Sequence, residues 1–220
     1  KVASGLAHEM ADPLNAAALH LGHLKRKWSD DRPETGRHLT VLEEELKRLD
    51  QVVKGFRRFA MLGEMRAEWF DLRGLLGEVA ERGREAMADR RIELVLDVDE
   101  LPERFWGDRA LLRQALTNLV ANAEQAMPGG GHITLAAQRV EAGVEIGVTD
   151  EGVGIPEELQ TCVFDLYFTT KEDGSGIGLA VVQQIVQLHG GRIRLRSAPG
   201  EGTQITLELP VRSLEAVHAA

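Results

Sequence analysis

The chain has 220 residues, of which 43% are hydrophobic, so it can bury the core of one large domain or two small ones. Its formal net charge of −9 disfavours nucleic acid or an anionic membrane as a partner, because phosphate-rich surfaces attract basic proteins. A single cysteine, Cys162, excludes internal disulfides and fits a reducing compartment, and no apolar run approaches the roughly 20 residues of a membrane helix. We therefore expect this part of the protein to be cytoplasmic and to make no membrane contact. The natural protein is expected to continue upstream of Lys1, and a membrane anchor there is left open.

Residues 2–62 carry their apolar side chains at helical spacing, in two stripes separated by a polar turn at residues 29–36. This pattern predicts an α-helical hairpin over residues 1–62, with two long amphipathic helices joined by a short loop. One hairpin leaves the stripes partly uncovered, whereas two hairpins form a four-helix bundle that covers them. We therefore expect a homodimer; the alternative is that the stripes pack on the rest of the chain.

After a predicted linker at residues 63–68, the pattern changes from all-helical to mixed. Helical spacing and strand-like alternation predict helices at residues 72–87, 109–127 (capped by Asp108) and 176–188, and strands at residues 92–98, 133–137, 144–149, 193–195 and 205–209. A long irregular stretch containing glycines occupies residues 150–175, and residues 213–220 form a tail. Together these elements predict an α+β two-layer sandwich, a sheet on helices, as a second domain over residues 69–212.

The first candidate site is His8, which is followed directly by Glu9 and, five residues on, by Pro13. A neutral imidazole nitrogen can attack phosphorus if the other ring nitrogen gives its proton to a base, and Glu9 is placed to be that base. Pro13 cannot donate to the carbonyl of Glu9, so the helix is expected to bend just past His8. The remaining histidines that we interpret as surface or packing residues are His20, His23, His38, His132 and His218.

Asn118 and Asn122 are four residues apart and so share one face of a predicted helix. Two neutral carboxamides there can offer oxygen to a hydrated Mg²⁺ ion without repelling phosphate. The alternative for this pair alone is that both asparagines face solvent.

Asp150, Gly152 and Gly154 directly follow a predicted strand. Glycines let the backbone pass close to a planar ligand, and a carboxylate at a strand end can accept a hydrogen bond from the exocyclic amino group of adenine. That charge-assisted bond would select adenine over guanine. As an isolated turn, this pattern is common and is weak evidence of a site.

Gly174, Gly176 and Gly178 open a predicted helix, whose amino-terminal N–H groups suit a phosphate chain. A dinucleotide-binding fold would place such glycines directly after a buried strand, whereas a polar loop precedes them here, which excludes that interpretation. Lys171 in this loop is a candidate for contacting a terminal phosphate; the alternative is a solvated surface charge.

The order and spacing of these motifs resemble the H, N, G1, F and G2 boxes of sensor histidine kinases, across nearly the whole chain. The matching residues are His8 and Glu9, Asn118 and Asn122, Asp150 with Gly152 and Gly154, residues 164–171, and Gly174 with Gly176 and Gly178. The Asn-Ala-Glu-Gln-Ala run at residues 122–126 is most similar to nitrogen-regulation-type kinases. The chain departs from the usual pattern at Asp12, where the family has Asn or Thr. It also departs at residues 166–167, which are Leu-Tyr here and Pro-Phe in the usual pattern.

The resemblance implies a dimerisation and histidine-phosphotransfer hairpin followed by a GHKL-type ATP-binding domain, the fold that these kinases share with DNA gyrase. His8 would attack the γ-phosphate of ATP with Glu9 as base, and the phosphoryl group would pass to an aspartate of a response-regulator receiver domain. Asn122 would be the principal Mg²⁺ ligand, and Asp150 would read adenine with a water held by Thr203. The residues that the resemblance implies for binding ATP are Asn118, Asn122, Asp150, Gly152, Gly154, Lys171, Gly174, Gly176, Gly178, Leu179 and Thr203.

Two other functions compete with the kinase. An ATP hydrolase of the same nucleotide fold would carry a water-activating glutamate four residues before Asn122, but this chain has Asn118 there. A scaffold that only holds nucleotide or only dimerises would lack a catalytic element, and none is visibly missing. Acid-labile, base-stable label on the protein after incubation with γ-labelled ATP would distinguish the kinase from both.

Overall fold

The computed structural model describes residues 65–166, 168–171 and 176–211, and the single helical positions Leu21, Glu43 and Leu46. The chain divides into two compact units, one of Lys1–Gly63 with Asp165–Ile177 and the other of Glu64–Phe164 with Gly178–Ala220. Apart from those three positions, the predicted hairpin over residues 1–62, including His8 and Glu9, lies outside the described residues. The strands and helices described below belong to the second unit.

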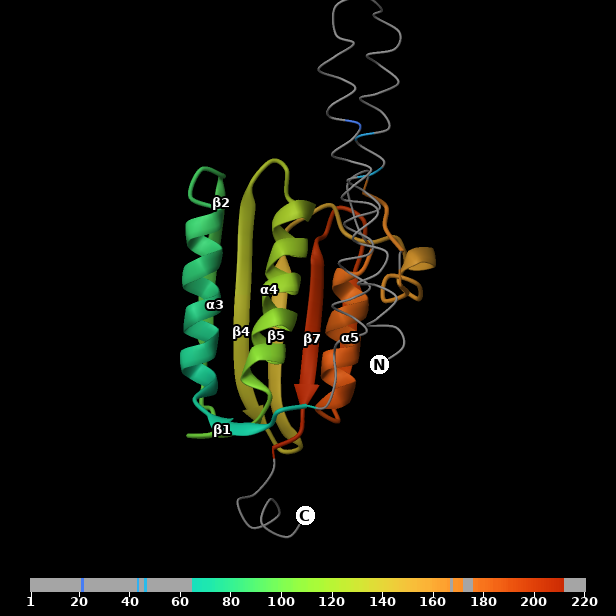
Figure 1. Ribbon diagram of the computed structural model, residues 1–220. Helices are drawn as coiled ribbons and strands as arrows, with labels where there is room; N and C mark the ends of the chain where they lie inside the picture. Colours follow the sequence, from blue (N-terminus) through green and yellow to red (C-terminus); the bar gives the residue numbers. More distant parts are fainter. Residues whose placement is uncertain are drawn as a thin grey trace, which may run out of the picture. The chain divides into compact units, whose positions relative to one another are not determined.

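This unit is built on a five-stranded sheet, whose strands lie in the order β2, β4, β5, β7, β6. Their bounds in that order are Ile92–Val98, Gly131–Val140, Gly143–Asp150, Thr203–Leu209 and Arg192–Ser197. β2 runs parallel to β4, and every other neighbouring pair is antiparallel. The helices α3 (Leu72–Ala86), α4 (Arg109–Ala126) and α5 (Gly178–Leu188) cover one face of the sheet (Figure 1). The predicted α+β two-layer sandwich is confirmed in this unit.

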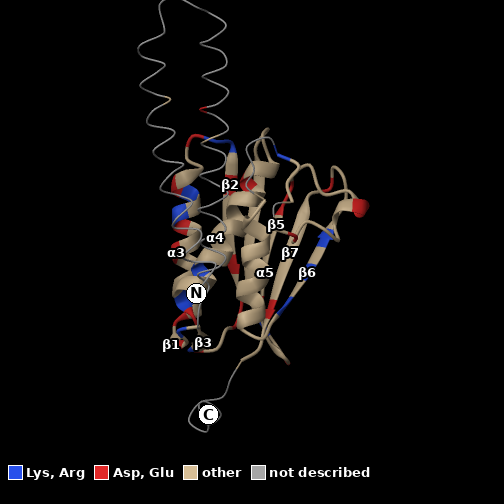
Figure 2. Ribbon diagram, turned by 45° about the vertical axis from the view of Figure 1, so that its right-hand side comes forward, with Lys and Arg blue, Asp and Glu red and all other residues tan. Residues whose placement is uncertain are grey.

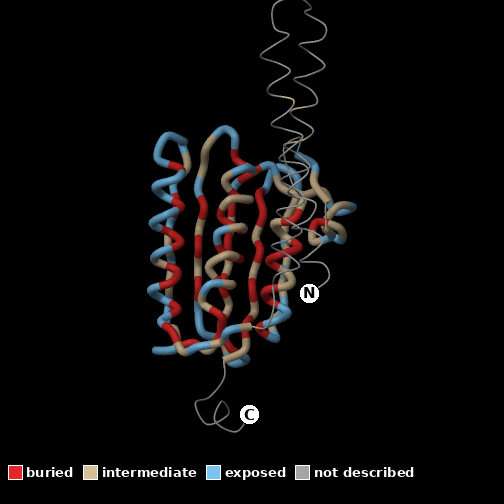
Figure 3. The backbone as a smooth tube through the Cα atoms, viewed as in Figure 1, coloured by how far each residue is buried: buried red, intermediate tan, exposed pale blue. Residues whose placement is uncertain are grey.

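The core lies between the sheet and the helices, because apolar side chains alternate along the strands and recur at helical spacing along the helices. In β5, Val144, Ile146 and Val148 are buried, and in α4 Leu112 and Leu116 are fully buried. Buried positions recur along the helices and along the central strands of the sheet (Figure 3). The other face of the sheet is polar, and the arginines of β6 mark it at the edge (Figure 2).

Helix ends follow local backbone chemistry. Asp108 caps α4 as predicted, because its Oδ1 accepts hydrogen bonds from the backbone N–H groups of Ala110 and Leu111, both at 3.0 Å. The helix predicted to start at Gly176 instead begins at Gly178. Gly176 has a φ of 63°, in the left-handed region, which a right-handed helix does not use.

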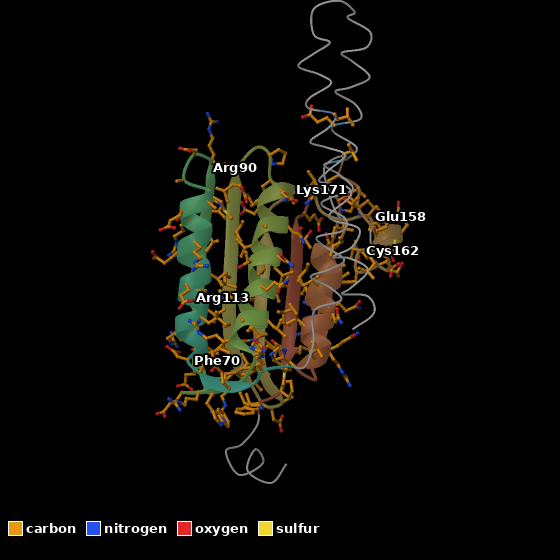
Figure 4. All side chains as sticks on the ribbon, viewed as in Figure 1. Phe70, Arg90, Arg113, Glu158, Cys162 and Lys171 are labelled. Atoms are coloured by element: carbon orange, nitrogen blue, oxygen red, sulfur yellow. The ribbon has the colours of Figure 1, made fainter. Side chains whose placement is uncertain are left out.

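A second, two-stranded sheet was missed by the sequence pattern: β1 (Glu68–Phe70) pairs antiparallel with β3 (Phe105–Gly107). The ring centroids of Trp69 and Trp106 are 5.3 Å apart, and those of Phe70 and Phe105 are 5.9 Å apart. Phe70 lies where β1 leads into α3 (Figure 4). The predicted linker at residues 63–68 therefore ends inside β1. Strands of three residues show too little alternation to be recognised in a sequence.

Candidate functional site

A row of polar side chains interrupts the apolar core at one end of the sheet. Asp150 is the last residue of β5, Thr203 the first of β7 and Ser197 the last of β6, and Thr203 pairs in register with both of the others. Asp150 and Thr203 continue the buried alternation of their strands, and Ser197 continues the half-buried alternation of β6, so all three lie on the face that the helices cover. Asp150 and Thr203 are only 7% and 8% exposed. Burying polar groups is unfavourable unless they are hydrogen-bonded, so their bonding pattern is informative.

Ser197 joins this row to the loop that follows β5. Its Oγ accepts a hydrogen bond from the backbone N–H of Ile155 at 2.8 Å, donates to the carbonyl oxygen of Gly202 at 2.8 Å, and lies 3.0 Å from Oγ1 of Thr203. Gln160 adds a second link, because its Nε2 donates to the carbonyl oxygens of Ile155 at 3.0 Å and Ser197 at 2.9 Å. The segment that carries Gln160, in which Glu158 and Cys162 are labelled, leaves the sheet on the side of α5 (Figure 4).

Neither Ser197 nor Gln160 was among the predicted site residues. A signal for Ser197 was present, because it continues the core-facing alternation of Ile193 and Leu195 and is polar at that position. Gln160 gave no such signal, since it lies in an irregular stretch where side-chain direction cannot be read from spacing.

The predicted glycines allow close backbone approaches around Asp150. The backbone N–H of Gly152 donates to Oδ1 of Asp150 at 2.8 Å, and a Cβ on Gly152 would lie 2.7 Å from both that oxygen and the carbonyl oxygen of Ala126. Gly154 has a φ of 71°, and a Cβ there would lie 1.9 Å from the carbonyl oxygen of Ala198. Side chains at these two positions are therefore excluded by sterics, which explains the glycines without reference to a ligand.

The two asparagines of α4 meet the first residue of α5. Nδ2 of Asn118 donates to the carbonyl oxygen of Gly178 at 3.2 Å, and a Cβ on Gly178 would lie 3.8 Å from Nδ2 and 3.9 Å from Oδ1 of Asn122. Both asparagines are half-buried, so the alternative of a fully solvated pair does not hold. Leu179, the next residue of α5, is also half-buried.

The end of α4 brings these two groups of residues together. The backbone N–H of Val153 donates to the carbonyl oxygen of Ala126 at 3.1 Å, and Ala126 lies one helical turn beyond Asn122. The loop after Asp150 is thereby fixed to the same helix that carries the asparagines. The second unit thus gathers most of the predicted ATP-binding residues: Asn118, Asn122, Asp150, Gly152, Gly154, Gly178, Leu179 and Thr203.

The remaining predicted residues belong to the other unit. Lys171 is exposed, and its backbone N–H donates to Oγ1 of Thr169 at 3.1 Å. Gly176 adopts the left-handed backbone already noted. Gly174, like His8 and Glu9, lies outside the described residues.

Two of the histidines are described, and they differ in environment. His132 is exposed, as expected of a surface residue, and the Glu151 carboxylate, which accepts a hydrogen bond from its Nδ1 at 2.9 Å, raises the pKa of its imidazole. His189 is buried at the end of α5 opposite Gly178, where its Nε2 accepts from the backbone N–H of Asp108 at 3.0 Å and its Nδ1 lies 2.7 Å from the carbonyl oxygen of Ile185. Burial lowers the pKa of His189, so it is a neutral structural residue near neutral pH.

The donor set fits Mg²⁺ held mainly by phosphate and water. Within the described ranges no three His, Cys, Asp or Glu side chains come together as a metal cluster. Mg²⁺ is usually bound through one or two protein oxygens together with substrate phosphates and water, and the Asn122 amide can supply one such oxygen.

The described part of the chain also has no helix with the length and apolarity needed to cross a membrane.

Comparison with known proteins gives a consistent result. The domain family described as histidine kinase-, DNA gyrase B-, and HSP90-like ATPase matches residues 107–213. Sensor histidine kinase ZraS of Escherichia coli (strain K12) is 34% identical over 213 residues, which cover 96% of this chain and 45% of ZraS. Signal transduction histidine-protein kinase AtoS of the same strain is 32% identical over 209 residues, which cover 94% of this chain and 34% of AtoS. The chain therefore spans less than half the length of these two relatives.

Solved structures are similar in both fold and sequence. The catalytic domain of histidine kinase ThkA is 32% identical with a TM-score of 0.62, covering 67% of this chain and 97% of that domain. ShkA full-length in complex with AMPPNP is 29% identical with a TM-score of 0.74, covering 96% of this chain and 46% of ShkA. The structure of ThkA in complex with response regulator protein TrrA is 26% identical with a TM-score of 0.69, and the match covers 94% of this chain and 61% of the matched chain. On its motifs, its fold and these matches, the chain belongs to the sensor histidine kinases, and residues 107–213 are its histidine kinase-, DNA gyrase B-, and HSP90-like ATPase domain.

Proposed function

We propose that this chain binds Mg·ATP, phosphorylates its own His8 and passes the phosphoryl group to an aspartate of a response regulator. The observation that carries the proposal is the joining of the Asp150–Thr203 row to the asparagine face of α4 within one unit. In this proposal residues 1–62 are the dimerisation and phosphotransfer hairpin of a homodimer, residues 63–68 the linker and residues 69–212 the catalytic domain. An ATP-consuming site of this kind is expected in the cytoplasm.

Adenine is proposed to bind at the polar row. Asp150 has a carboxylate with about four acceptor positions, one of which takes the N–H of Gly152. A carboxylate can accept more than one hydrogen bond, so Asp150 would also accept from the exocyclic amino group of adenine in a charge-assisted bond. The tight backbone at Gly152 and Gly154 would form the wall beside the base, and Thr203 would complete the acceptor edge next to Asp150.

The phosphates are proposed to lie between the asparagines and the start of α5. The first turn of a helix has backbone N–H groups without helical partners, and these favour an anion. Asn118 holds this end of α5 through its bond to Gly178, so its main contribution would be to position the helix. Asn122, on the same face of α4, would be the magnesium ligand, and the ion would supply positive charge against the phosphates. Lys171, Gly174 and Gly176 are further candidates for phosphate contacts, and their roles rest on the sequence motif.

The chemical step is proposed to be a direct phosphoryl transfer. A bond forms between one ring nitrogen of His8 and the γ-phosphorus, the bond from that phosphorus to the bridging oxygen breaks, and ADP leaves with the electron pair. The proton of the other ring nitrogen passes to Glu9. In the second transfer the N–P bond breaks and an aspartate oxygen of the regulator takes the phosphoryl group. His8 and Glu9 lie outside the described residues, so these roles rest on the sequence motif.

Two similar structures support the substrates. ShkA is seen in complex with AMPPNP, an ATP analogue, and ThkA in complex with the response regulator protein TrrA. By similarity, this chain would bind ATP in the second unit and a receiver domain as its phosphorylation partner.

The competing hydrolase is disfavoured by chemistry at Asn118. A water-attacking mechanism needs a carboxylate there to take a proton, whereas a carboxamide is not a base, and the amide of Asn118 already donates to the backbone of Gly178. The competing scaffold remains a distinct outcome of the experiment that follows.

The test is incubation of the full chain with γ-labelled ATP and Mg²⁺. Acid-labile, base-stable label on the protein is the expected result, and His8→Gln should abolish it while ATP binding survives. His132→Gln, which changes an exposed histidine elsewhere in the chain, is the matched control and should label normally. Free phosphate without protein label would support the hydrolase, neither product would support the scaffold, and label that persists in His8→Gln would overturn the assignment of His8.

A further inference from the structure

Ser197 Oγ has three polar neighbours, and their chemistry fixes where every hydrogen lies. The neighbours are the backbone N–H of Ile155 at 2.8 Å, the carbonyl oxygen of Gly202 at 2.8 Å and Oγ1 of Thr203 at 3.0 Å. A serine hydroxyl has one hydrogen to donate and two lone pairs to accept with. A carbonyl only accepts, so that hydrogen goes to Gly202, and an amide N–H only donates, so Ser197 accepts from Ile155. The contact with Thr203 then has one possible direction, in which Thr203 donates to Ser197.

This direction determines what Thr203 can offer to a ligand. Thr203 has a single hydroxyl hydrogen, and because that hydrogen points at Ser197, only lone pairs remain for any other partner. Asp150 lies opposite Thr203 on the neighbouring strand, and its carboxylate is also an acceptor. Both side chains are buried on the helix-covered face, which limits the access of water to them. This end of the sheet therefore presents an edge made of acceptors.

We propose that Ser197 is a specificity-determining residue of the nucleotide site, which acts by holding the Thr203 hydroxyl as an acceptor. The proposal rests on the function proposed above and deepens it. A 6-aminopurine has two hydrogens on its amino group, which match the two acceptors, Asp150 and Thr203. A 6-oxopurine such as hypoxanthine or guanine has only lone pairs at that position and meets acceptor against acceptor, and this mismatch rejects it.

The same selection operates if a water lies between Thr203 and the base. A water that donates one hydrogen to Asp150 and the other to Thr203 turns its lone pairs to the ligand, so it accepts from a 6-amino group and repels a 6-oxo group. Without Ser197, the Thr203 hydroxyl can rotate and donate, either to that water or to the 6-oxo group. Loss of the Ser197 hydroxyl should therefore relax selectivity as well as loosen the loop.

The experiment measures dissociation constants of ATP and inosine triphosphate by calorimetry on the full chain. Ser197→Ala should lower the ratio of the inosine triphosphate constant to the ATP constant about fivefold or more, the effect of one hydrogen bond. Ser197→Thr keeps a hydroxyl and should retain the wild-type ratio. Thr203→Val removes the controlled hydroxyl, so it should also lower the ratio, and adding Ser197→Ala to it should change the ratio no further.

Gln160→Ala is the control for a merely structural effect. It removes the other link between the loop and β6 without touching Thr203, so it should weaken both nucleotides equally and leave the ratio unchanged. An unchanged ratio in Ser197→Ala, or an equal fall in Gln160→Ala, would overturn the role of Ser197 while the proposed function stands. A wild-type chain that binds no ATP would instead overturn the proposed function, and this inference with it.

Discussion

Replacing Asp150 by asparagine tests the proposed adenine site with little change in the shape of the side chain. Oδ1 of Asp150 accepts from the N–H of Gly152 at 2.8 Å, and a carboxamide can keep that bond only by using its oxygen there. Its NH₂ group then takes the place of the second carboxylate oxygen. A donor would face the amino group of adenine, which is also a donor, and the charge-assisted bond would be lost.

The expected loss of ATP affinity follows from the loss of that one hydrogen bond. Loss of a hydrogen bond to a charged group costs about 1.5–3 kcal/mol, and each 1.4 kcal/mol is tenfold, so the ATP dissociation constant should rise roughly 10- to 150-fold. The free energy of unfolding should change little, because the bond to Gly152 survives. Asp150→Ala loses that bond as well and should destabilise the domain by about 1–3 kcal/mol.

The assay pairs calorimetric ATP binding with urea unfolding for each variant. Glu145→Gln is the matched control, since it makes the same acid-to-amide change on the same strand but on the outer face, beside Arg194. It should leave ATP affinity unchanged. An unaltered dissociation constant in Asp150→Asn would refute the adenine role, and a loss of affinity explained entirely by lost folding would do so as well.

Three further outcomes are expected. Asp108→Ala removes the α4 cap and the bond from the backbone N–H of Arg66 at 2.9 Å, so it should lower the urea-unfolding free energy by about 1–3 kcal/mol; the exposed control Asp99→Ala should cost under about 0.5 kcal/mol. Burial lowers the pKa of His189 below 6.5, although the Asp108 carboxylate acts in the other direction, so the unfolded chain binds more protons and the free energy of unfolding should fall as the pH drops below 6.5. His189→Gln should weaken this pH dependence in urea titrations, and an equal pH dependence in both proteins would contradict the prediction. Asn122→Asp should weaken ATP binding more when a chelator removes Mg²⁺ than when Mg²⁺ is present, because without the metal the new carboxylate repels the phosphates. The ratio of the ATP dissociation constants with chelator and with Mg²⁺ should therefore exceed the wild-type ratio, and an unchanged ratio would contradict the ligand role of Asn122.

Much of the fold of the second unit could be predicted from local sequence alone. Helix α4 could be placed because Asp108 offers a side-chain cap and apolar residues recur every three or four positions, and both signals act within one turn. Asp150 and the glycines after it could be named for a similar reason, since a strand end followed by closely spaced glycines is a local backbone pattern. Asn118 and Asn122 could be named as site residues from their four-residue spacing and from the resemblance to the family's N box.

Tertiary structure decided the features that depend on partners far apart in the chain. Gly176 could not be excluded from α5 by spacing, because its left-handed φ is a property of the folded backbone. Trp69 and Trp106 meet across β1 and β3 only when the chain has closed a long loop. The register of β5, β6 and β7 aligns Asp150, Thr203 and Ser197, and a shift of one residue would turn the side chains of a strand to the other face. That register is set by burial of the whole sheet against the helices. The hydrogen bond between the hydroxyls of Thr203 and Ser197 could therefore be found only in the folded protein.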